Sequence, residues 1–167
     1  MDGNMDMKAL TNTLSVQLQL LEELLALLTR ETREMSEMNL EAMAEINDRK
    51  EELTARIEAH AGPLSQSILW AVSREGLPAN ATLGDLAVKL EQKGNREIPR
   101  LQRDLNRMAK EIHQTASVNR GIAERFVATA STALNFLTRL INQSNVYGAS
   151  GGYLQRPKGA VMINKEA

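Results

Sequence analysis

The chain has 167 residues, a net charge of −1 and an aromatic content of 3%. Its richness in Leu, Ala, Glu, Arg and Met, with four prolines in all, predicts an all-α protein. Cysteine is absent, which excludes disulfides, cysteine-bound zinc and thiol catalysis, and fits a cytoplasmic protein. The acidic start of the chain is unlike a secretory signal, and the longest apolar run, residues 24–28, is too short to span a membrane.

Two long helices are predicted in the first third of the chain. Residues 8–37 form the first, because leucines recur along one face at Leu14, Leu18, Leu21, Leu25 and Leu28. The phase of the apolar positions changes near Asn39. The Asn39 side chain can accept hydrogen bonds from the free amides of a following helix. A second helix is then predicted over residues 40–61, ending at Gly62-Pro63 because proline disrupts a helix interior.

Two short helices are predicted next, folded over one end of the long ones. Residues 64–76 carry the only tryptophan, Trp70, which we expect to plug the core there rather than to bind a partner. Thr82 is suited to cap a further short helix that ends near Gly94.

The last long helix is predicted over residues 96–143, where apolar residues follow a heptad repeat: Leu101, Leu105, Met108, Ile112, Ile122, Phe126, Ala133, Phe136 and Leu140. The predicted fold is therefore an elongated antiparallel bundle or coiled coil of three long helices and two short ones. One seam is expected to bury Leu21, Leu25, Leu28, Leu105, Ile112, Ile122 and Phe126. Residues 1–62 carry 6 basic and 13 acidic side chains and residues 63–167 carry 14 and 8, so charge attraction is expected to steer the first two helices onto the last.

Two polar residues interrupt the apolar faces. Lys50 lies on the apolar face of the second helix, where its ammonium group either reaches water or pairs with a carboxylate of the first helix, such as Glu31. Asn119 falls in the seam of the last helix. There it either sets the register of the bundle from a buried position, or it caps a local break or sits half exposed, with Gly121 nearby.

No catalytic, cofactor or metal site is expected. The two histidines, His60 and His113, each follow a glutamate by two residues, a spacing that places the pair on different sides of a helix. A basic stripe recurs along the last helix at Arg96, Arg100, Arg103, Arg107 and Lys110. We interpret it as a solvated face, because acidic residues flank it and no aromatics interleave; a nucleic-acid site and a site for an acidic protein are the alternatives.

The domain prediction divides the chain into a helical bundle, residues 1–144, and a flexible, glycine-containing tail, residues 145–167. Four glycines and one proline within residues 148–159 interrupt any helix there, and the tail retains scattered apolar residues.

Three segments of the chain stand out together. They are LLALLTRETREMSEMNLEAMAEINDRKEELTARI, with Glu31 and Lys50; VNRGIAERFVATASTALNFLTRL, with Asn119; and VYGASGG, followed by a tail ending in VMINK. In this order they resemble the FlgN family of flagellar export chaperones. The first segment is similar to the family's first two helices, the second to its last helix with its asparagine, and the third to its Tyr-Gly-x-x-Gly turn and apolar terminus.

The resemblance implies a cytoplasmic bacterial protein without enzymatic activity or cofactor. It would bind hook–filament junction subunits through their C-terminal helices and deliver them to the flagellar type III export gate, which the tyrosine matching Tyr147 would contact. The implied partner-binding residues are Phe136, Leu137, Leu140, Ile141, Tyr147, Gly148, Tyr153, Val161 and Ile163. Nucleic-acid binding and membrane insertion are not expected, and self-association is left open. A coiled-coil scaffold or adaptor is the alternative, because it explains the heptads equally well.

Overall fold

A computed structural model describes residues 2–143 of the chain, with side chains described from Met7 to Leu140. Every regular element in that part is helical, as predicted: α1 (Asp2–Ser36), α2 (Leu40–Arg74), α3 (Leu83–Gln92) and α4 (Glu97–Gln143). The chain divides into two compact units, residues 1–123 and residues 124–167. The first unit therefore holds α1, α2, α3 and α4 as far as Ala123, and the second begins with the rest of α4.

The predicted break at Gly62-Pro63 is wrong, because α2 continues through Pro63 to Arg74. The described chain accordingly has one short helix, not two, and the predicted helix over residues 64–76 is the last part of α2. A proline in a helix interior costs about 3 kcal/mol. Here Pro63 and Ala59, the residue whose carbonyl would accept from an amide at position 63, are both exposed, and buried residues lie on both sides of the proline, at Leu53 and Val72. Packing of both flanks outweighs the local penalty.

Three helix ends share one hydrogen-bond pattern, the Schellman motif, in which the residue after the helix adopts a positive φ. Gly76 (φ 66°) ends α2 and Gly94 (φ 86°) ends α3, whereas Met38 (φ 55°) ends α1. In each case the next amide donates to a carbonyl five residues back at 3.0 Å: Asn39 to Glu34, Leu77 to Val72, and Asn95 to Leu90. Met38 pays a steric cost that glycine does not, because its Cβ crowds the neighbouring carbonyl.

The helix starts are capped largely as predicted. Asn39 Oδ1 accepts from the Ala42 amide at 3.2 Å, and Thr82 forms a reciprocal capping box with Asp85. Donors from Thr82 hold the pKa of the Asp85 carboxyl below its usual range. At the start of α4 the Asn95 side chain accepts from two successive amides, at 3.0 and 3.1 Å. Pro99 then follows in the first turn, where its missing amide leaves no bond unmade.

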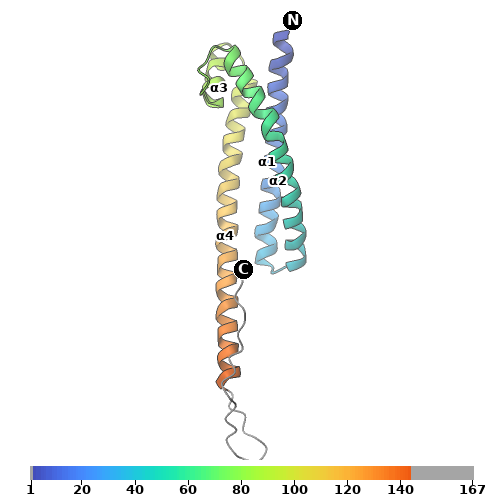
Figure 1. The fold of residues 1–167 in the computed structure, drawn as a ribbon, viewed down its shortest axis with the longest axis vertical. Helices are drawn as coiled ribbons and strands as arrows, with labels where there is room; N and C mark the ends of the chain where they lie inside the picture. Colours follow the sequence, from blue (N-terminus) through green and yellow to red (C-terminus); the bar gives the residue numbers. More distant parts are fainter. Residues whose placement is uncertain (1, 144–167) are drawn as a thin grey trace, which may run out of the picture. The chain divides into compact units, whose positions relative to one another are not determined.

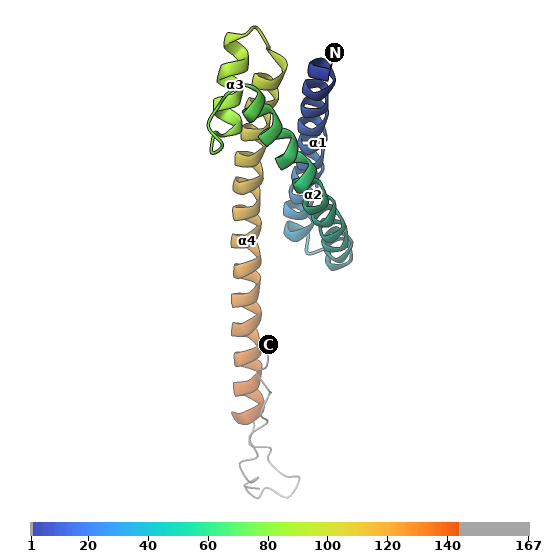
Figure 2. The same ribbon diagram turned by 45° about the horizontal axis from the view of Figure 1, so that its top comes forward.

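Within the first unit α1 and α2 form an antiparallel hairpin, seen side by side in both ribbon views (Figures 1 and 2). The main core lies at the end where the first turns of α1 meet the last turns of α2, α3 and the first turns of α4. Its buried members are Leu10, Leu14, Ala71, Val72, Leu86, Leu90, Ile98 and Leu101. Trp70 packs partly buried against this cluster, as expected, with the Arg74 guanidinium 5.1 Å from the centre of its ring.

The predicted single core seam is only partly correct. Leu28 is buried, but the other predicted members are half-buried: Leu21, Leu25, Leu105, Ile112, Ile122 and Phe126. The physical reason is the number of neighbours. Side chains are enclosed most completely where four elements converge, whereas along the middle of the helices only some, such as Leu28, Ile46 and Leu53, are buried and the others keep an open flank.

The first part of α4 runs parallel to α1 and antiparallel to α2. Leu10 of α1 and Leu101 of α4 belong to the same core cluster, and the Asn119 side chain donates to the Leu28 carbonyl at 2.8 Å. Leu28 follows Leu10, and Asn119 follows Leu101, by the same number of residues, so the two helices keep one register over this distance. The first and last helices are in contact, as the predicted bundle requires.

Candidate functional site

The predicted partner-binding residues divide into two groups. Phe136, Leu137 and Leu140 lie on α4 and expose 61%, 52% and 48% of their surface. Ile141 also lies on α4, but its side chain is not among those described. The remaining five fall outside the described residues: Tyr147, Gly148, Tyr153, Val161 and Ile163.

The second unit presents an exposed helix. From Val127 to Leu140 every side chain of α4 is exposed. Besides the three predicted residues, Val127 (68%) and Leu134 (61%) leave most of their surface in water. We call these five residues the apolar face of α4. Exposed apolar side chains gathered on one helix are typical of a protein-binding surface.

Val127 and Leu134 were not among the predicted site residues. The sequence analysis followed the heptad seam through Phe126, Phe136 and Leu140, and these two residues lie on a different side of the helix. Their spacing of seven residues places them above one another on the helix, so a search for a second heptad position would have found them.

A buried polar layer joins the three long helices within the first unit. The Glu31 carboxylate of α1 accepts from Lys50 of α2 at 2.5 Å and from the Asn119 amide of α4 at 2.8 Å. Asn119 is 5% exposed, and the side chains of Glu31 and Lys50 are 14% and 25% exposed. Lys50 thus pairs with Glu31, the second of the two arrangements considered for it. Because α4 continues unbroken past Gly121, Asn119 caps no local break.

The polar layer satisfies its own hydrogen-bonding groups. Asn119 Oδ1 lies 2.5 Å from the Thr32 hydroxyl, and its amide also donates to the Leu28 carbonyl at 2.8 Å. Among the described residues no buried side-chain nitrogen or oxygen lacks a partner. An asparagine bonded in this way stabilises one register, because a shift along the helix would leave its amide without partners.

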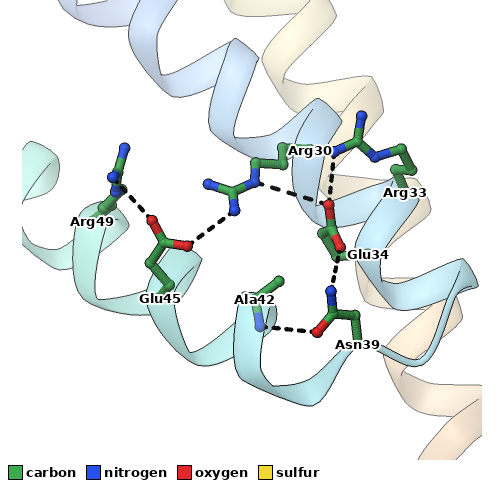
Figure 3. A network of polar contacts seen from close by, with 7 residues as sticks. All are labelled: Arg30, Arg33, Glu34, Asn39, Ala42, Glu45 and Arg49. Atoms are coloured by element: carbon green, nitrogen blue, oxygen red, sulfur yellow. Dashed lines mark hydrogen bonds and ion pairs between the residues drawn. The ribbon is translucent and has the colours of Figure 1, made fainter.

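A second polar network surrounds the bend between α1 and α2 (Figure 3). Glu34 is 5% exposed and accepts from Arg33 at 2.7 Å and from the Asn39 side chain at 2.9 Å. The bond from Arg33, followed by that from Asn39, outweighs burial and lowers the pKa of the Glu34 carboxyl. Arg30 lies between Glu34 and Glu45, 3.0 Å from the latter, and so links the two helices. This network fixes the bend and offers no reactive group.

The basic stripe of α4, defined above from Arg96 to Lys110, is exposed along its whole length. Arg103 pairs with Glu91 of α3 at 3.6 Å, and Arg107 with Asp104 in the preceding turn at 3.2 Å. Among the described ion pairs none joins this stripe to α1 or α2; the pairs that cross between helices of the hairpin link α1 to α2. The ion pairs described for this stripe therefore do not hold α4 against the hairpin, as expected for a solvated face, and the charge attraction between the two halves of the chain stays a prediction.

The described side chains contain no group of three or more histidines, aspartates and glutamates placed to hold a metal ion. His113 is exposed, whereas His60 is half-buried and its Nε2 lies 2.9 Å from the Thr13 carbonyl oxygen. None of the described helices has the length and apolarity needed to cross a membrane. The exposed apolar face of α4 is consequently the best candidate site in this part of the chain.

In the comparison with protein families, the family model described as FlgN protein matches residues 5–155. The matched range includes α1 almost entirely, all of α2, α3 and α4, and the segment that follows. No curated protein and no solved structure matches the chain at a significant level.

Proposed function

This chain belongs to the FlgN family of flagellar export chaperones, which bind hook-associated proteins and are not enzymes, and we propose that it holds these clients on the apolar face of α4. The observation that supports this client site is the exposure of five large apolar side chains between Val127 and Leu140 of one helix. A client helix with an apolar stripe of its own would cover them and remove both surfaces from water. We place this encounter in the bacterial cytoplasm, before export.

The free energy gained by burying this face can be compared with the free-energy cost of association. Fully burying a leucine, valine or phenylalanine contributes about 1.5–3 kcal/mol. Five side chains that are each about half exposed contribute roughly half of that apiece, some 4–8 kcal/mol in total. Association itself costs an estimated 4–15 kcal/mol, so the face alone supports weak binding.

We therefore propose that the tail, residues 145–167, adds partner contacts through Tyr153, Val161 and Ile163. Deleting residues 145–167 is expected to leave the helical content unchanged and to weaken client capture. Circular dichroism and a pull-down with a purified hook-associated protein test this together. Full client binding by the truncated chain would refute the role of the tail, and loss of helical content would show that the tail supports the fold instead.

The proposed contact with the export gate rests on Tyr147. This residue follows α4 closely and precedes Gly148, and a tyrosine offers a large apolar ring and one hydroxyl at low entropic cost. Tyr147→Ala is expected to preserve melting temperature and client affinity while reducing gate binding and secretion of the junction subunits. A parallel fall in stability and in every interaction would instead mean that the ring covers the end of the helix. A variant that docks and secretes normally would rule the gate contact out.

A further inference from the structure

We propose that Gly62-Pro63 is a hinge in α2, at which residues 54–63 of this helix open away from α1 and close again. We call residues 54–63 the strap. The opening uncovers Leu20 of α1, which is 4% exposed in the closed hairpin. This device belongs to the α1–α2 hairpin and is separate from the client site proposed on α4.

The two hinge residues weaken α2 without a packing gain. Pro63 lacks the amide that would donate to the Ala59 carbonyl, and its ring crowds that carbonyl. Gly62 loses more backbone entropy in a helix than alanine does, yet its φ is not positive and no neighbouring group lies within 4 Å of the place where a Cβ would stand. Residues that contradict their own helix in this way are expected at functional or strained positions.

The strap is held to α1 by few contacts. Within α2, which the structure describes throughout, no residue between Leu53 and Ala71 is buried. Arg56 of the strap pairs with Glu23 of α1 at 2.7 Å, but the two side chains are 52% and 50% exposed, so water screens the attraction. A helical segment with little buried apolar surface opens at a lower free energy than the core.

Both flanks of the strap are anchored. On one side Ala71 and Val72 belong to the main core cluster, and on the other Ile46 is fully buried and Lys50 pairs with Glu31. Releasing either flank would expose buried apolar side chains to water, which costs far more than releasing the exposed strap. The strap therefore opens while the ends of α2 stay packed.

The part of α1 under the strap is identified by its hydrogen bonds. His60 Nε2 lies 2.9 Å from the Thr13 carbonyl oxygen, and beyond the hinge the Ser67 hydroxyl lies 3.4 Å from the Thr13 hydroxyl. Leu20 follows Thr13 by about two helical turns, so both lie on the side of α1 that faces α2. Opening the strap breaks the bond to His60 and exposes Leu20, whereas Ser67 stays on the anchored flank.

The absence of cysteine from the chain allows a thiol to report the opening. Leu20→Cys places a thiol under the strap, and Leu14→Cys is the matched control on the same helix, at a fully buried position of the main core. Reaction of each thiol with a maleimide is measured under native conditions. We expect Leu20→Cys to react at least tenfold faster, because local opening costs less than unfolding of the core.

Substitutions at the hinge and in the core separate local from global opening. Gly62→Ala should slow the reaction of Leu20→Cys about fivefold and Pro63→Ala at least tenfold, because both strengthen the closed helix. Leu86→Ala removes a buried core side chain of α3, so it should speed the reaction of Leu14→Cys at least tenfold and leave that of Leu20→Cys within about twofold.

Hydrogen exchange of the unmodified chain gives a second measurement that requires no cysteine variant. Strap amides should exchange at least tenfold faster than those of residues 46–53 and 68–74. Uniform exchange along α2, or equal reaction of the two thiols, would mean that α2 opens only by global unfolding and would overturn the proposal. It would be overturned as well if Pro63→Ala left the reaction of Leu20→Cys unchanged, or lowered the stability to urea, since Pro63 would then form a fixed bend.

Discussion

Replacing Asn119 by alanine should destabilise the protein and remove the hydrogen bonds that hold the three long helices in one register. The side chain donates to Glu31 and to the Leu28 carbonyl at 2.8 Å each, and its oxygen lies 2.5 Å from the Thr32 hydroxyl. A hydrogen bond between neutral groups contributes about 1 kcal/mol, and one to a charged group about 1.5–3 kcal/mol. Part of this total is recovered, because Glu31 keeps its pairing with Lys50 and Thr32 can still donate to Leu28. We expect a net loss of roughly 2–4 kcal/mol in the free energy of unfolding.

Two further substitutions at Asn119 sharpen this expectation. Asn119→Asp keeps the shape but removes the donor and places a second carboxylate beside Glu31, so it should destabilise more than alanine at pH 7. The gap between this variant and the wild type should narrow in acid, where one of the two carboxyls takes up a proton and donates. Asn119→Leu should recover part of the stability through apolar burial but lose the unique register.

Urea unfolding followed by circular dichroism measures all three variants, and cross-linking between engineered cysteine pairs on α1 and α4 reports the register. A loss below about 0.5 kcal/mol for Asn119→Ala would refute the reasoning, because surface substitutions fall within that range. The reasoning would fail equally if Asn119→Asp matched alanine at every pH.

Three other expectations concern the first unit. Leu14→Ala, at a fully buried core position, should cost about 2–5 kcal/mol, whereas the half-buried Leu25→Ala should cost less; equal melting temperatures would contradict the location of the core. Met38→Gly should raise the melting temperature slightly, because Met38 holds a positive φ with its side chain 68% exposed, and a fall would show that the methionine makes contacts worth more than its strain. The pKa of Glu34 is lowered in the folded state, so its contribution is present above the ordinary glutamate pKa and is lost as pH falls through the folded value. Glu34→Gln should therefore reduce the loss of stability that occurs as pH falls. If the melting temperature of this variant fell with acid as steeply as that of the wild type, Glu34 would not make this contribution.

Local signals in the sequence were sufficient for most helix boundaries. The Asn39 and Thr82 caps, the end at Gly94 and the extent of α4 were all predicted, because a cap or a glycine end involves residues within one turn. The apolar character of α4 beyond Ala123 is equally local. Its exposure follows from the structure, because the heptad pattern is the same whether or not a partner covers it.

The tertiary structure decided what depends on residues far apart in the chain. The sequence placed a helix end at Pro63, but packing on both sides carries α2 through it, and no local pattern records that packing. Glu31, Lys50 and Asn119 were each recognised separately, and the choice between solvent and a carboxylate for Lys50 stayed open until the fold brought the three together. The residue types and their periodicity thus determined that this chain is helical and where α2, α3 and α4 begin, whereas α1 begins at Asp2 and not at the predicted residue 8. Burial, which requires neighbours from other helices, determined which polar groups meet and which apolar face is left for a partner.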